Sequence, residues 1–170
     1  MLPTCQDLGI NYPVYIRKMN SKSHWNPEGC SSEAERAEIV AAKVFKDGVN
    51  SLWLITSDSD FYGIIAALSE KRPSKYQDID FFVITEEELY EVNIILNPSS
   101  EGSCLAVQSK HFNINIDPVE AKKLCHNLIA KDREPTRCKK RHTTLIIEHQ
   151  KELGCKAVNY DSQQCACEEN

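Results

Sequence analysis

The sequence predicts a mixed α/β (α+β) fold: a largely parallel central sheet flanked by helices, with a β-hairpin and two C-terminal helices. Three observations lead to this expectation. Apolar runs alternate with segments of helical periodicity over residues 1–95, as in βαβ units. The runs at 52–55 and 79–84 are uninterrupted, as expected of strands buried on both faces. Alternating apolar residues at 112–116 indicate one strand of the hairpin.

The first half of the chain supplies the predicted parallel sheet. Residues 14–17 form the first expected strand. Ser32 and Glu35 have the spacing of a capping box, and the apolar residues that follow repeat at helical spacing, so we expect a helix that Gly48 ends. The run at 52–55 is the second strand.

A second helix is expected to join the runs at 52–55 and 79–84. Phe61, Ile64, Ile65 and Leu68 repeat at helical spacing before Pro73. Two strands joined through a helix are typically parallel with a right-handed crossover. We therefore expect residues 52–55 and 79–84 to be neighbouring strands at the centre of the sheet.

The second half is expected to begin with a short helix, since Thr85 and Glu88 again have capping-box spacing. Residues 93–96 could be a further strand, and residues 104–107 are expected to pair with 112–116 as the hairpin. Asp117 and Pro118 are typical of a helix start. The last helix is expected from about residue 138 to residue 153.

Composition limits the class of protein. The chain has 170 residues, a formal charge of −5 and no apolar run near the roughly 18 residues that span a bilayer, so no membrane partner is expected. No secretory signal is evident, and the eight cysteines are scattered, so we expect reduced thiols and a cytoplasmic location. Residues 1–155 are expected to form one domain, and 156–170 a flexible tail with Cys165 and Cys167.

Asp58 and Asp60 are the candidate catalytic and metal-binding residues. They lie in residues 54–65 (LITSDSDFYGII), where a buried strand runs into a helix. Strand-to-helix turns are common ligand sites in open parallel sheets, and paired carboxylates are suitable ligands for Mg²⁺ or Mn²⁺. The alternative is that Ser57 or Asp58 only caps the helix, with the carboxylates favoured by its dipole.

Residues 54–65 also resemble the strand-turn-helix of NYN/PIN-type nucleases, in which a Ser-Gly-Asp-x-Asp-Phe stretch supplies acidic metal ligands. The resemblance implies a metal-dependent nuclease that uses Asp58 and Asp60. Such a site needs further carboxylates, and the candidates by position are Asp7, Glu33, Glu35 and Asp80.

Two other groups of residues are candidates for a binding surface. Arg17, His24 and Trp25 combine a cation with aromatic and imidazole groups, although Trp25 could equally fill the core. The basic run Arg137, Lys139, Lys140 and Arg141 could contact a phosphate backbone or an acidic protein, or it could be a solvated helix face.

Two functions follow as hypotheses. The first is a small intracellular non-catalytic binding or regulatory module that acts through a protein partner and needs no cofactor. It rests on the lack of a complete catalytic constellation, since glycine-rich phosphate loops and a nucleophile elbow are absent from the sequence. The second is the metal-dependent nuclease. His111 is a further candidate site residue: it is either a general base or a surface or hydrogen-bonded structural histidine.

Overall fold

The computed structural model describes the whole chain except residues 47, 70–76, 102–104, 157 and 159–170. Six strands form one sheet: β1 (Val14–Met19), β2 (Gly48–Ile55), β3 (Ile79–Ile84), β4 (Asn97–Pro98), β5 (His111–Ile116) and β6 (Thr136–Cys138). The helices are α1 (Glu33–Val44), α2 (Asp58–Ser69), α3 (Glu86–Tyr90), α4 (Leu105–Gln108), α5 (Pro118–Ala130) and α6 (Lys140–Glu152). Two 3-10 turns, η1 (Gln6–Leu8) and η2 (Lys22–Trp25), flank β1. The predicted tail therefore falls almost entirely outside the described residues.

The sheet is antiparallel, which overturns the prediction of a largely parallel one. The strand order is β4-β5-β2-β1-β3-β6, and every neighbouring pair is antiparallel. The prediction that residues 52–55 and 79–84 are neighbours is also wrong, because β1 lies between β2 and β3 and pairs with both. The two runs are nevertheless interior strands.

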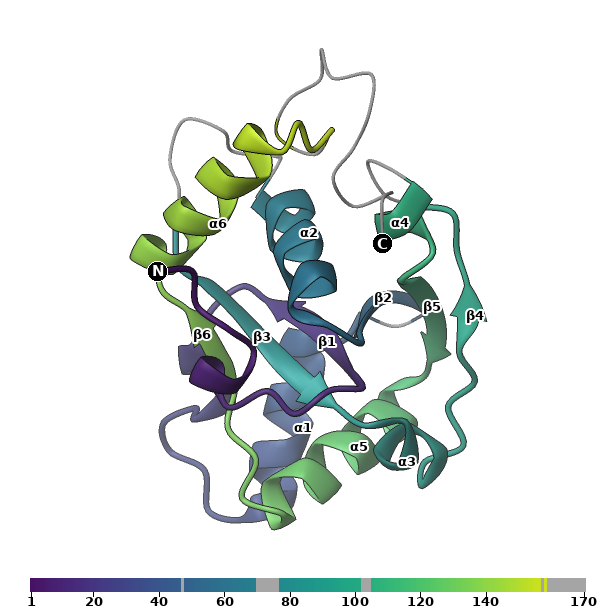
Figure 1. Cartoon of the computed structure of the whole chain (residues 1–170). Coiled ribbons are helices and arrows are strands. Elements are labelled where there is room, and N and C mark those ends of the chain that lie inside the picture. Colours follow the sequence, from purple (N-terminus) through teal and green to yellow (C-terminus); the bar gives the residue numbers. More distant parts are fainter. Residues whose placement is uncertain (47, 70–76, 102–104, 157, 159–170) are drawn as a thin grey trace.

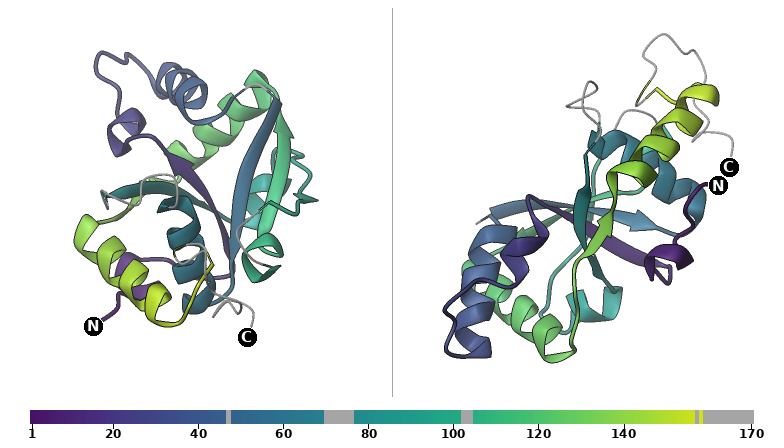
Figure 2. Two further views of the ribbon diagram at one scale, coloured as in Figure 1. Left: turned by 90° about the horizontal axis from the view of Figure 1, so that it is seen from above. Right: turned by 90° about the vertical axis from the view of Figure 1, so that its left-hand side faces the viewer.

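Helices on both faces of the sheet explain why the apolar pattern was misleading. Figure 1 shows α2 and α6 on one side of the sheet and α1 and α5 on the other, and the two views in Figure 2 agree. In β3, Phe82 and Ile84 pack in the core beneath α1 and α5, while Phe81 packs with α2 and α6. Double-sided burial makes a strand continuously apolar whatever the direction of its neighbours.

The predicted helix starts are confirmed where a side chain caps the helix. The hydroxyl of Ser32 accepts a hydrogen bond from the backbone of Glu35 at the start of α1. Thr85 and Glu88 form a complete capping box at α3, and Asp117 and Glu120 form another at α5. Each motif satisfies backbone N–H groups that the first helical turn leaves without a partner.

Gly48 and the predicted strand at 93–96 are placed differently. Helix α1 ends at Val44, with Phe45 as its C-cap, and Gly48 instead begins β2 with a φ of 95°. Residues 93–96 are not a strand. Asn93 has a left-handed φ of 59°, and the backbone N–H of Ile94 bonds to the carbonyl of Leu89, which folds the chain back at the end of α3.

The predicted hairpin is also wrong. Cys104 lies outside the described residues, and residues 105–107 belong to α4 rather than to a strand. A run this short has no periodicity that separates helix from strand. Strand β5 pairs instead with β2 along its whole length, and β6, which the sequence did not predict, precedes α6 at the other edge of the sheet.

Candidate functional site

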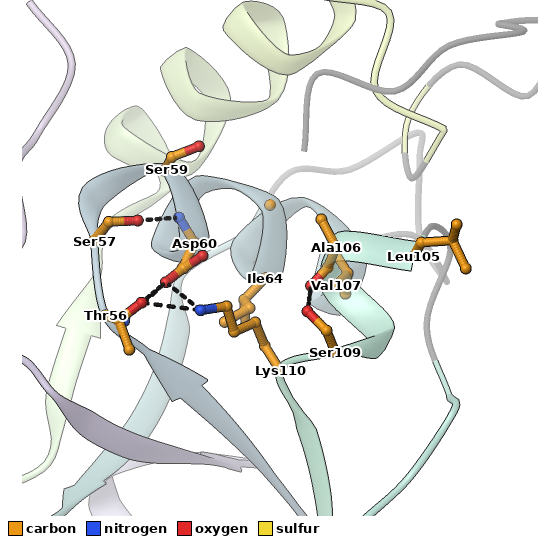
Figure 3. Close-up of a pocket in the computed structure, with 11 residues that line it drawn as sticks. Thr56, Ser57, Ser59, Asp60, Ile64, Leu105, Ala106, Val107, Ser109 and Lys110 are labelled. Atoms are coloured by element: carbon orange, nitrogen blue, oxygen red, sulfur yellow. Dashed lines mark hydrogen bonds and ion pairs between the residues drawn. The ribbon is translucent and has the colours of Figure 1, made fainter. Parts of the chain in front are cut away.

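The turn between β2 and α2 forms one side of a pocket of about 500 Å³. Helix α4 and the residues that lead into β5 form the opposite side (Figure 3). Six polar residues line it: Thr56, Ser57, Ser59, Asp60, Ser109 and Lys110. Both candidate acidic residues belong to α2, but Asp60 lines the pocket whereas Asp58 does not.

Reciprocal hydrogen bonds cap α2 at this turn. The Ser57 hydroxyl oxygen accepts from the backbone N–H of Asp60 at 3.1 Å. The Asp60 carboxylate reaches back, and its Oδ2 accepts from the backbone N–H of Thr56 at 2.9 Å and from the Thr56 hydroxyl at 2.5 Å. These bonds resemble those of a capping box. The capping arrangement that the sequence allowed is therefore present, with Ser57 as the capping residue.

Lys110 is the counter-ion of Asp60. Its Nζ lies 3.2 Å from Asp60 Oδ2 and donates to the Thr56 hydroxyl oxygen at 2.9 Å. The side chains are 24% and 17% exposed, so the pair is partly shielded from water. Partial burial opposes ionisation of Asp60, but the hydrogen bonds from Thr56 and the charge of Lys110 outweigh it, and the Asp60 pKa is lowered. Asp60 is thus ionised and neutralised within the protein.

Asp58 binds the N-terminal segment instead of Lys110. Its Oδ1 accepts from the backbone N–H of Cys5 at 2.7 Å, which fixes the N-terminal segment against the start of α2. Burial raises the pKa of the Cys5 thiol, and the neighbouring Asp58 raises it further. The Cys5 side chain is therefore a neutral thiol rather than a reactive thiolate.

Three of the four other carboxylates proposed from the sequence bond elsewhere, and the fourth, Glu33, is exposed in the first turn of α1. Asp7 binds Thr4, Glu35 binds Ser31, and Asp80 binds Arg137. Over the described part of the chain, no three His, Cys, Asp or Glu side chains gather as a metal site would require. Asp58 Oδ1 accepts from Cys5, Asp60 Oδ2 accepts from Thr56, and Lys110 supplies a positive charge beside Asp60. A shared Mg²⁺ or Mn²⁺ at these two residues stays a prediction.

Aliphatic side chains from both sides of the pocket form a wall beside the cap. Ile64 of α2 and Val107 of α4 line it, and Leu105 extends it outward with 71% of its surface exposed. The Ser109 hydroxyl donates to the carbonyl of Ala106 at 2.6 Å, which closes the end of α4. An apolar wall beside a polar cap is typical of a site that binds small groups through shape and a few directed hydrogen bonds.

Arg17 and Trp25, two of the proposed surface residues, are engaged inside the protein. Trp25 is fully buried, its indole N–H donates to the carbonyl of Arg133 at 2.8 Å, and its ring packs on Phe82. Arg17 donates to the carbonyl of Val44 at the end of α1. Arg17 and His24 are partly exposed, whereas Trp25 is buried and adds nothing to a recognition surface.

The basic run divides into two parts. Arg137 makes two hydrogen bonds to the buried Asp80, at 2.7 and 2.8 Å, and so joins β6 to β3. Lys139, Lys140 and Arg141 are exposed at the start of α6, away from the pocket. Their contact with a phosphate backbone or an acidic partner stays a prediction.

His111 packs beside the pocket without lining it. Its side chain is buried and its ring lies 4.2 Å from that of Trp53. Burial lowers the His111 pKa, and the carboxylate of Glu101, 3.8 Å from Nε2, opposes this shift. The imidazole is neutral at neutral pH, and within the described residues neither ring nitrogen has a hydrogen-bond partner, so the choice between a general base and a structural histidine stays a prediction.

Lys110 and α4 are the parts of the site that sequence reasoning missed. Lys110 follows a segment expected to be a hairpin strand, and nothing near it in the sequence indicates a partnership with Asp60. The contact forms because β5 pairs with β2, which brings the start of β5 beside the end of β2.

Comparisons of the chain with protein-family models, curated proteins and solved structures give no match. None of the helices in the described ranges is both long enough and apolar enough to cross a membrane.

Proposed function

We propose that this chain is a non-catalytic binding module that recognises a partner protein through the pocket between α2 and α4. The observation that carries the proposal is the Asp60–Lys110 pair, which is partly buried and internally neutralised beside an exposed apolar residue, Leu105. Such a site offers hydrogen bonds and apolar contact without a group poised to react. These are the features by which small sites on proteins select a ligand.

The state of the charged groups supports binding over catalysis. A general base works best with a pKa near the working pH, and the Asp60 pKa is shifted down, away from neutrality. Lys110 already places a positive charge 3.2 Å from Asp60 Oδ2, and like charges repel, so a second cation beside this carboxylate is disfavoured.

A selection from a random-peptide display library tests the proposal. Peptides selected on the wild-type protein should lose at least about tenfold in affinity for Leu105→Glu, since the change places a charge on the apolar wall. The matched control is Val119→Glu, because Val119 is similarly exposed, at 75%, but lies on α5 on the other face of the sheet. The proposal would be contradicted if the peptides bound Leu105→Glu and Val119→Glu equally well, or if the selection enriched no peptide.

The nuclease hypothesis gives a different outcome. Single- and double-stranded RNA and DNA would be incubated with the protein and Mn²⁺. Cleavage that requires the metal and disappears in Asp60→Asn would contradict the binding-module proposal and support the nuclease hypothesis. The binding module predicts no cleavage and no saturable Mn²⁺ site at α2.

A further inference from the structure

One acceptor and one donor stand side by side and unused in the pocket. All the hydrogen bonds and the ion pair of the Asp60 carboxylate fall on Oδ2, and over the described residues Oδ1 has no partner. The Lys110 ammonium carries three N–H groups, and its contacts within the same ranges are Thr56 and Asp60. A third N–H therefore remains for a ligand beside Oδ1. Figure 3 shows the two side chains turned toward each other at the polar end of the pocket.

The charge of the pair determines which ligands fit. Asp60 and Lys110 cancel each other, and both are shielded enough for their interaction to exceed its strength in water. An entering carboxylate would be repelled by Asp60, and an entering ammonium by Lys110. A neutral group that accepts and donates in one plane meets neither repulsion and uses both free positions.

We infer that the pocket recognises a primary carboxamide, the side chain of a glutamine or asparagine, in an exposed segment of the partner protein. The amide oxygen accepts from Lys110 Nζ, and the amide nitrogen donates to Asp60 Oδ1. This inference rests on the proposed function and specifies the ligand of the same site.

The rest of the pocket favours glutamine. The Ile64, Leu105 and Val107 side chains form the aliphatic wall beside the polar end, where they can contact the methylene groups of the ligand. Glutamine has two such groups and asparagine one. The Ser109 hydroxyl donates internally to Ala106, so its oxygen is left as an acceptor for the second amide N–H. A pocket of about 500 Å³ also has room for the neighbouring residues of a peptide.

Three capped amino acids test the inference as probes: N-acetyl-glutamine N-methylamide and its glutamate and methionine counterparts. The methionine probe has a similar length without the amide, and the glutamate probe has the same shape with a charge. Titration into the ¹⁵N-labelled full chain, followed by two-dimensional NMR, should shift α2 and β5 resonances with the glutamine probe. Its affinity should exceed that of the other two at least about tenfold, because a site built for a polar group rejects its non-bonding analogue.

Lys110→Met is the matching variant, since it removes the donor and keeps the length of the side chain. It should abolish the preference for glutamine over methionine while the rest of the spectrum stays that of the folded protein. The control is Lys122→Met, because Lys122 is also paired with a carboxylate, Glu38, at 2.7 Å on another part of the surface. This variant should bind the glutamine probe as the wild type does.

Several outcomes would overturn the inference: equal binding of the glutamate or methionine probe, no shift with any probe, or an unchanged preference in Lys110→Met. Its failure is distinguishable from that of the proposed function. Selected peptides that lack glutamine and asparagine, yet lose affinity for Leu105→Glu, would leave the binding module in place and remove only the carboxamide.

Discussion

Replacement of Asp60 by Asn distinguishes a helix cap from a metal ligand by the direction of the stability change. The swap deletes one charge and almost no volume. In the structure, Asp60 is paired with Lys110 at 3.2 Å and lies in the first turn of α2. The change therefore removes an ion pair and a favourable interaction with the helix dipole, while the remaining amide oxygen can still accept from Thr56.

The expected loss is about 1.5 kcal/mol of unfolding free energy. A partly buried ion pair with this geometry contributes about 1 kcal/mol, at the upper end for pairs near the surface. A carboxylate in the first turn of a helix contributes about 0.5 kcal/mol. Urea unfolding followed by circular dichroism at neutral pH would measure the difference. Glu28→Gln is the charge control, since Glu28 is exposed and makes no hydrogen bond or ion pair within the described ranges.

The pH dependence gives the same test a second readout. The Asp60 pKa is lower in the folded protein than in the unfolded chain, so its ionised form stabilises the fold above the unfolded value, about 4. That stabilisation is lost as the pH falls through the lower, folded pKa. The gap between wild type and Asp60→Asn should hold from pH 7 to about pH 5 and shrink below about pH 4.

A metal site predicts the reverse. Crowded carboxylates repel one another when no cation is bound, so Asp60→Asn would then stabilise the metal-free protein. Mn²⁺ would raise the stability of the wild type and not of the variant. Either result would refute the capping argument.

Two further substitutions test packing away from the pocket, and a labelling experiment tests the thiols. Arg137→Met should lower the unfolding free energy by about 2 kcal/mol in urea, because the buried Asp80 loses two charge-assisted hydrogen bonds. Trp25→Ala should lower it by about 3–5 kcal/mol by the same assay, since a fully buried ring is removed from the core; a loss below about 1 kcal/mol would contradict this. Cys125, whose pKa is raised by burial to about 12, should react with iodoacetamide far more slowly than Cys30 in the native protein, and both should react fully after denaturation without reductant. Protection of either thiol after denaturation would indicate a disulfide.

Helix starts could be predicted from the sequence because their chemistry is local. Ser32, Thr85 and Asp117 each bond to a backbone group within three residues, so the residues that make the cap are adjacent in the printed sequence. Strand segments with long apolar runs were predicted for a similar reason, and β3 has the predicted bounds of residues 79–84.

The direction and order of the strands could not be predicted in this way. An apolar run indicates that a strand is buried, but it does not indicate the direction of the strand. A strand covered by helices on both faces has the same composition in a parallel and an antiparallel sheet. The position of β1 between β2 and β3 depends on pairings between residues far apart, such as Tyr15 with Leu54 and with Ile84. No local pattern specifies these pairings.

The resemblance at residues 54–65 has a physical basis that does not depend on catalysis. Carboxylates in the first turn of a helix satisfy its backbone N–H groups and complement its dipole, so a strand-to-helix turn favours the same residues in a cap as in a metal site. What separates the two cases is the cation that neutralises the carboxylates. Here the ammonium of Lys110 contacts Asp60, and it comes from a strand whose place beside β2 the sequence does not specify. The character of the site is thus decided by a long-range contact, and Lys110 is the residue at which the proposed recognition can be removed while the hydrogen bonds that cap α2 are kept.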